Sequence, residues 1–166
     1  MRYNYGSAIK LEVMVMNQLR RLSMLFLTLI ITIPAVSQPD AATPEAQALA
    51  TLDRFMAAFN RQDLKSWSET LHYPHIRFAS SQVNIYDTPT AFQNRSVFSA
   101  LQATGWDHSL WTQRTITLSS DTKVHIDTEF ERRNAEGQTI GRYRSLYIVT
   151  EQNGRWGIQA RSSLAP

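Results

Sequence analysis

Residues 48–71 read ALATLDRFMAAFNRQDLKSWSETL, and this stretch carries the strongest structural signal in the chain. Apolar side chains recur in steps of three and four, at Leu49, Leu52, Phe55, Met56 and Phe59. This spacing predicts an amphipathic helix, with Thr43 as its cap and Pro44 in its first position. Asp63 can cap a second, shorter helix over residues 64–71. The domain is therefore expected to open with two helices.

After these helices the sequence changes to alternating patterns. Residues 75–88 predict a strand or a short hairpin, and Thr88-Pro89 opens a third helix that ends near Gly105. From Ser109 the apolar period is two, which predicts four strands at 109–118, 122–133, 139–151 and 154–163. The pair Asn153-Gly154 is typical of a tight hairpin turn. We therefore predict an α+β domain, in which three N-terminal helices pack in a strongly bent antiparallel sheet.

Residues 1–37 have the features of a signal peptide. Two arginines precede an apolar run over residues 24–36, which is too short to span a bilayer comfortably. Small residues favour cleavage after Ser37, and an uncleaved N-terminal anchor is the alternative. We predict a periplasmic or secreted protein with a flexible lead over residues 38–43 and a single domain over residues 44–166.

The charge and the cysteine count exclude several classes of function. The chain has 17 basic and 14 acidic side chains, but four of the basic ones and one acidic one lie in residues 1–37. The remainder is balanced, so nothing in it indicates binding to nucleic acid or, once the signal is removed, to a membrane. The sequence has no cysteine, which excludes disulfides, thiol catalysis and cysteine zinc sites. It also contains no phosphate loop, nucleotide fingerprint or nucleophile elbow.

The order of these elements resembles the nuclear transport factor 2-like (SnoaL-like) superfamily. The resemblance is carried by residues 48–71, by HIRFASS at 75–81, by the helix near 90–103 and by GRWGIQARSSLAP at 154–166. It implies a cone, in which a bent sheet wraps around helices and leaves a pocket at the open end. Members of the superfamily include ketosteroid isomerases, dehydratases, cyclases and proteins without any chemistry, so the fold alone does not fix a function.

The catalytic residues of the ketosteroid isomerases do not carry over to this sequence. Their carboxylate base corresponds to a position near Ser80, and a serine without a base cannot abstract a carbon-bound proton at neutral pH. Their neutral aspartic acid corresponds to Arg144, which stays charged. Both differences argue against isomerase chemistry.

Six residues are the candidates for a site in the cone. His75 and Asp127 form a candidate catalytic pair, by analogy with the His–Asp pairs of related dehydratases and cyclases. The candidate pocket residues are Tyr73, Tyr86, Trp106 and Arg144. The alternation in KVHIDTEFE competes with this interpretation, because it places Asp127 on the polar, outward face of its strand. Tyr86 and Trp106 are equally compatible with simple core packing.

For two of the predicted strands, the sequence pattern does not decide which side chains face the interior. If Ile76 and Phe78 face the core, His75 and Arg77 face away from it or line its rim. If Leu146 faces the interior, Arg144 on the same face points into the pocket. An arginine there either clamps an acidic molecule or pairs with a neighbouring carboxylate, such as that of Glu129 or Asp107.

Three functions remain open at this point. The sequence favours a binding protein for a small apolar or weakly acidic molecule, and no cofactor or metal is expected, because His72 and His75 lack a third ligand. The alternatives are a cofactor-free isomerase, dehydratase or cyclase, and a scaffold that uses the sheet face of Tyr143 and Tyr147. That face is also the expected interface of a homodimer.

Overall fold

The computed structural model describes residues 42–79, 81–95 and 97–165. The predicted signal peptide, its cleavage site and Ser80 lie outside the described residues. The helices are α2 (Pro44–Asn60), α3 (Leu64–Glu69), α4 (Pro89–Gln93) and α5 (Val97–Gln102). The strands are β1 (Leu71–Phe78), β2 (Val83–Tyr86), β3 (His108–Ser120), β4 (Lys123–Arg133), β5 (Thr139–Gln152) and β6 (Arg155–Ser163). Within the described ranges, no helix is long and apolar enough to cross a membrane.

The first two helices begin at the residues that the sequence offers as caps. The Thr43 hydroxyl accepts a hydrogen bond from the Ala46 amide at 3.2 Å, and Pro44 occupies the first turn of α2. The Asp63 carboxylate accepts one from the Ser66 amide at 3.0 Å at the start of α3. These side chains satisfy amide groups that a helix leaves without a partner. The two predicted helix starts are thus confirmed.

The predicted third helix is two short helices rather than one. Helix α4 ends at Gln93, and α5 begins at Val97. Between them, the Arg95 Nε donates a hydrogen bond to the Phe92 carbonyl oxygen at 3.0 Å, which closes the last turn of α4. The break turns Arg95 toward the interior, where its guanidinium lies 3.8 Å from the centroid of the Phe92 ring.

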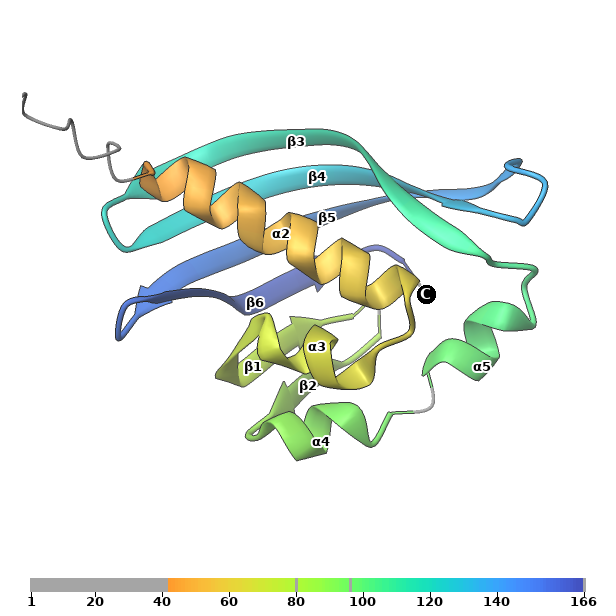
Figure 1. Cartoon of the computed structure of the whole chain (residues 1–166), viewed down its shortest axis with the longest axis horizontal. Coiled ribbons are helices and arrows are strands. Elements are labelled where there is room, and N and C mark those ends of the chain that lie inside the picture. The colour runs from red at the N-terminus through yellow and green to blue at the C-terminus, as the bar shows by residue number, and fades with distance from the viewer. Residues whose placement is uncertain (1–41, 80, 96, 166) are drawn as a thin grey trace, which may run out of the picture. The chain divides into compact units, whose positions relative to one another are not determined.

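The four predicted C-terminal strands form a meander, and its last turn has the geometry that the sequence predicts. Asn153 and Gly154 both have positive φ angles, 54° and 78°, between the paired residues Gln152 and Arg155. A two-residue turn of this kind matches the twist of an antiparallel pair. Figure 1 shows the long strands β3 to β6 side by side, with α2 lying across them.

The six-stranded sheet is mixed, not wholly antiparallel as predicted. Its strand order is β2-β1-β6-β5-β4-β3, and β1 runs parallel to β6. All other neighbouring pairs are antiparallel. The sequence interpretation missed the parallel pair because it joins the first strand of the domain to the last, and local patterns report only pairings between neighbours in the chain.

Strand β1 differs from its prediction in both position and orientation. It begins at Leu71, within the range predicted for the second helix, and continues through Pro74, before the predicted start at residue 75. His75 is only 3% exposed, whereas Phe78 is 47% exposed. Ile76 and Phe78 therefore do not face the core, which was one of the directions that the sequence left open. His75 and Arg77 point to the interior instead.

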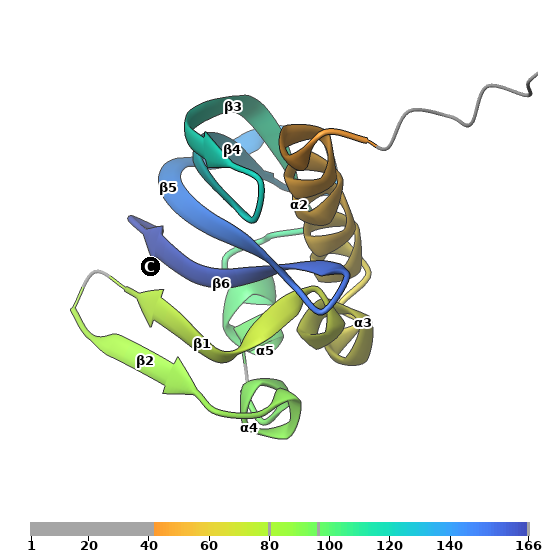
Figure 2. The ribbon, with the colours of Figure 1, turned by 90° about the vertical axis from the view of Figure 1, so that its left-hand side faces the viewer.

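The core lies between the helices and the concave face of the sheet. Figure 2 shows the sheet bending around α2, α3 and α5, which all lie on one side of it. The interior residues of β4 are those that the alternation predicts, with Val124, Ile126 and Thr128 fully buried. Aromatic side chains fill much of the core. They include Phe55, Phe59, Trp67, Phe92, Phe98 and Tyr147.

Candidate ligand-binding cavity

A cavity of about 300 Å³ remains between the helices and the sheet. Its walls are mostly aromatic and aliphatic, and come from α2, α3, α4, α5 and the inner sheet face. The apolar lining consists of Phe55, Met56, Phe59, Trp67, Phe92, Val97, Ala100, Leu101, Phe130, Tyr147 and Ala165. A concave, mainly apolar space with a few polar groups is the usual form of a small-molecule site, and this volume lies at the small end of the range for such sites.

Four arginines also line this cavity: Arg77, Arg95, Arg132 and Arg161. Arg77 and Arg161 are register partners on the parallel strands β1 and β6. Arg132 comes from β4, and Arg95 comes from the break between α4 and α5. Four separate segments of the chain thus bring a guanidinium to one space.

Three of the four guanidinium groups, those of Arg95, Arg132 and Arg161, lie beside aromatic rings. Arg161 donates from Nη2 to the Oγ atoms of Ser145 and Ser163, at 3.2 and 3.0 Å, and lies 5.1 Å from the centroid of the Tyr147 ring. Arg132 lies 4.7 Å from the centroid of the Tyr143 ring. These contacts are cation–π interactions, which stabilise a cation without neutralising its charge.

No carboxylate balances these charges within the described part of the chain. None of the residues that line the cavity is acidic. The arginine ion pairs of the described residues involve other arginines, namely Arg114, Arg133, Arg142 and Arg144. One buried nitrogen on each of them has no hydrogen-bond partner among the described residues. Burial lowers the pKa of the Arg161 guanidinium, and the nearby charges of Arg77, Arg132 and Arg95 lower it further. An arginine nevertheless stays protonated in a protein, so the cavity is strongly cationic.

His75 adds a neutral group to the same wall. Its Nδ1 lies 3.1 Å from the carbonyl oxygen of Ile158, which can only accept, so Nδ1 carries the proton and Nε2 keeps a lone pair. Burial lowers the pKa of His75 to about 4, and the nearby charges of Arg95 and Arg161 act in the same direction. The imidazole is therefore neutral near pH 7. It can accept a proton or a hydrogen bond through Nε2.

The sequence of the domain matches a family described as NTF2-like protein (DUF6841) over residues 45–165. The chain belongs to this NTF2-like family. No curated protein sequence matches it. The superfamily and the fold class that the sequence predicts are thus confirmed.

Solved structures similar to this NTF2-like domain share its fold at low sequence identity. A protein of unknown function with a cystatin-like fold from Nostoc punctiforme has a TM-score of 0.61 and 13% identity, over 74% of this chain and 90% of its own. An NTF2-like protein of unknown function from Shewanella oneidensis has a TM-score of 0.57 and 13% identity, over 74% and 100% of the two chains. A protein from Catenulispora acidiphila, solved in complex with S-DNPA, has a TM-score of 0.58 and 13% identity, over 72% and 91%.

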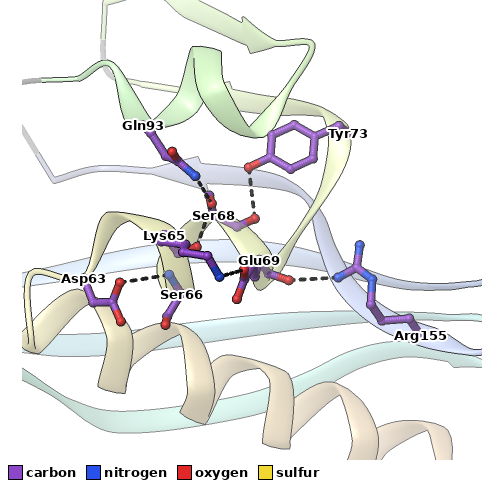
Figure 3. A network of polar contacts seen from close by, with 8 residues as sticks. All are labelled: Asp63, Lys65, Ser66, Ser68, Glu69, Tyr73, Gln93 and Arg155. Carbon is purple, nitrogen blue, oxygen red and sulfur yellow. Dashed lines mark hydrogen bonds and ion pairs between the residues drawn. The ribbon is translucent and has the colours of Figure 1, made fainter.

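Of the predicted site residues in this NTF2-like domain, only His75 lines the cavity. Tyr73 turns toward α3, where its hydroxyl donates a hydrogen bond to the Ser68 carbonyl oxygen at 3.0 Å (Figure 3). Trp106 is buried and donates from Nε1 to the Ser109 hydroxyl at 2.9 Å. Tyr86 packs behind the lining, with its ring centroid 5.3 Å from that of Phe92. These three aromatic residues support the cavity from outside its wall.

Asp127 and Arg144 lie on the outer face of the sheet. Arg144 donates from Nη2 to the Asp127 carboxylate at 2.6 Å, and its side chain is 61% exposed. The interior position of β5 belongs to Tyr147, which is 1% exposed. The interpretation of Arg144 as a residue that points into the interior is therefore wrong, as is that of Tyr147 as part of a free sheet face. His75 and Asp127 do not meet, because they lie on opposite faces of the sheet.

None of the four cavity arginines was among the six site candidates from the sequence, and for Arg161 the reason is a β-bulge. The bulge lies in β6. Ile158 of β6 pairs with Val149 of β5, whereas Ala160 pairs with Ile148, so Gln159 is an extra residue between them. The extra residue reverses the alternation beyond it and turns Arg161 inward. Arg132, by contrast, lies on the inward side that simple alternation in β4 defines. Extending that alternation by one step beyond Phe130 would have found it.

Metal binding has no support in the described residues. Within them, no three histidine, aspartate or glutamate side chains gather closely enough to hold an ion. The cavity instead offers one neutral imidazole and four cations. Such a set of groups suits an anion or a polarisable organic ligand rather than a cation.

Proposed function

We propose that this NTF2-like domain binds a small, largely apolar molecule in the cavity between its helices and the concave face of its sheet. The observation that carries the proposal is the cavity of about 300 Å³ itself, which stays open although many large aromatic residues surround it. Buried apolar walls provide the free energy for binding such a molecule, because the ligand leaves water when it enters. The similar fold from Catenulispora acidiphila that was solved with S-DNPA is consistent with this function.

A neutral fluorescent probe tests the proposal. N-phenylnaphthylamine fluoresces strongly in apolar surroundings, and we expect it to bind the purified domain saturably with one site per chain. Ala100 is exposed on α5 and also lines the cavity, so Ala100→Trp should obstruct access and abolish the signal. Ala103→Trp is the matched control, because Ala103 is exposed just beyond α5 and lies outside the lining. Binding that survives Ala100→Trp unchanged would place the probe elsewhere and contradict the proposal.

His75 favours a second function, proton abstraction from a bound ligand. A buried imidazole with a free Nε2 is a general base, and the nearby arginines can stabilise the negative charge that develops on the ligand. Nitrobenzisoxazole provides a test, because removal of its ring C–H proton breaks the N–O bond and releases a coloured phenolate. We expect the domain to accelerate this reaction and His75→Asn to remove the acceleration. Equal rates for the two proteins would exclude His75 as a base.

We also propose that the domain works outside the cytoplasm as a homodimer. The apolar run and the cleavage site in residues 24–37 support export. Exposed apolar side chains on the outer sheet face support the dimer, and they include Phe78, Val83, Ile85 and Leu146. Neither property bears on the cavity, so each can be tested separately from ligand binding.

A further inference from the structure

The positive charges of the cavity arginines are not balanced by acidic side chains among the described residues of the ligand-free domain. Buried charges are normally paired, because removing an ion from water costs several kcal/mol unless a counter-charge or good hydrogen bonds replace the solvent. In the described residues, Arg77, Arg95, Arg132 and Arg161 have no carboxylate partner. A cluster of unpaired cations is therefore retained at a cost in stability. Such a cost is characteristic of a binding site.

The four groups also converge on one another. Arg77 and Arg161 are adjacent across the parallel pair of β1 and β6. The charges of Arg77, Arg132 and Arg95 all act on Arg161, and those of Arg95 and Arg161 act on His75. Guanidinium groups bind planar oxyanions such as carboxylates through two parallel hydrogen bonds. One buried nitrogen on each arginine lacks a hydrogen-bond partner among the described residues, namely Nε of Arg77, Arg132 and Arg161 and Nη2 of Arg95.

The apolar part of the cavity wall argues against a ligand that consists only of a small inorganic ion. Phe59, Val97, Leu101 and Met56 offer it no hydrogen bonds, and a simple hydrated anion would leave most of this space unfilled. Aromatic rings beside the guanidinium groups instead favour a flat or alicyclic body next to the charged group.

We propose that the ligand is an organic amphiphile with an apolar body and an anionic head group, such as a carboxylate, sulfonate or phosphate, and that Arg77, Arg95, Arg132 and Arg161 form the subsite for that head group. The proposal rests on the proposed function and adds the chemical class of the ligand. His75 Nε2 can accept a hydrogen bond from a protonated head group or from a hydroxyl beside it.

A matched pair of probes separates this inference from the proposed function. Anilinonaphthalene sulfonate and N-phenylnaphthylamine share an aromatic body, and only the first carries an anion. We expect the wild-type domain to bind the sulfonate at least about tenfold more tightly. Arg161→Met or Arg77→Met should remove most of that difference between the two probes. Arg144→Met on the outer face is the matched control and should change neither affinity, which also excludes surface binding of the sulfonate.

Each outcome of this experiment decides between the two proposals. Equal binding of both probes by the wild type, unaffected by the two interior substitutions, would overturn the anionic subsite and leave the apolar cavity as the site. Failure of both probes to bind would overturn the proposed function as well. If Arg161→Met does not fold, Arg77→Met gives the answer alone, because the Arg77 side chain makes no hydrogen bond or ion pair among those identified in the described residues.

Competition then identifies the head group. Octanoate, octyl phosphate and inorganic phosphate are each titrated against the bound sulfonate probe. We expect one or both of the octyl compounds to displace it, and the better competitor distinguishes a carboxylate from a phosphate. Displacement by inorganic phosphate at the same concentration would show that the apolar body is not recognised and would contradict the amphiphile.

Discussion

Arg77 in β1 and Arg161 in β6 are register partners on two parallel strands, and both line the same cavity. Two like charges side by side in a poorly hydrated space repel each other. The inner face of a sheet is also the place where a charge is least well solvated.

We predict that Arg161→Met stabilises the ligand-free domain. The substitution removes a buried, unpaired cation and leaves an apolar side chain of similar length, and such replacements are neutral or stabilising by about 1–4 kcal/mol. We expect the lower part of this range, about 1–2 kcal/mol, because two serine hydroxyls lose a donor. The rise in midpoint is then roughly 4–8 °C by thermal unfolding. Arg144→Met should not raise the midpoint, and a large drop for Arg161→Met would show that this arginine is already paired in the ligand-free state.

The stability should fall in mild acid because of His75. Its folded pKa is about 4, below the ordinary value of 6.5, so protons bind the unfolded chain more tightly. The stabilisation is complete above pH 6.5, is lost as pH falls toward 4 and changes no further below that. Between about pH 7.5 and about pH 5 the loss from this group is about 2 kcal/mol.

Urea unfolding as a function of pH, with wild type and His75→Asn side by side, measures this contribution. The asparagine amide can replace the Nδ1 donor but does not titrate, so the curve of the variant should be flatter. His72, whose pKa is also lowered by burial and by Arg155, contributes to both curves and cancels in the difference. His125→Asn on the outer face serves as the control. Parallel curves for wild type and His75→Asn would contradict the buried, neutral imidazole.

The ion pair of Asp127 and Arg144 on the outer face should contribute little to stability or to ligand binding. Its members are partly exposed, and an exposed ion pair contributes little because water and salt screen it. We expect Asp127→Asn and Arg144→Met to leave the unfolding midpoint almost unchanged and to leave probe binding and any proton-transfer activity intact. Loss of activity in Asp127→Asn at unchanged stability would restore the His–Asp pair as a hypothesis.

The sequence prediction placed a homodimer interface at Tyr143 and Tyr147, but these side chains pack against the core. The homodimer that we propose should instead use a row of outer-face residues that crosses four strands. Leu146 pairs with Ser162, Ser162 with Phe78, and Phe78 with Val83, so all four share the outer face. Phe78→Asp should make the protein monomeric in sedimentation velocity, because a charge in an apolar interface is desolvated without a partner. Leu118→Asp is the control, since Leu118 is also exposed and lies on the distant edge strand β3. A wild type that is monomeric at micromolar concentration would refute the dimer.

The predicted export is tested on the chain expressed in full. If the signal peptide is removed after Ser37, the product recovered outside the cytoplasm begins at Gln38, and intact-mass spectrometry reports its length. Replacing Ala35 and Ser37 by leucine should block the cleavage, because the processing site requires small residues. A full-length product in the membrane fraction would instead support the uncleaved anchor.

Local sequence determined the elements of this protein wherever one element carried its own signal. Thr43 and Asp63 fixed the starts of two helices, since a capping hydroxyl or carboxylate acts within one turn. Asn153-Gly154 fixed a hairpin, and the alternation of β4 correctly separated buried Val124 from the outward residues. Together with the order of helices and strands, these signals were enough for the fold class and the superfamily.

Only the tertiary structure decided which side chains share the cavity. The pairing of β1 with β6 joins residues 84 positions apart in the chain, such as Arg77 and Arg161, and no local pattern reports a contact at that separation. A single extra residue, Gln159, turns Arg161 inward, because one added residue reverses every side chain beyond it in a strand. The sequence therefore determined that helices lie within a bent sheet. Long-range pairing and one bulge decided that the space between them is lined by cations.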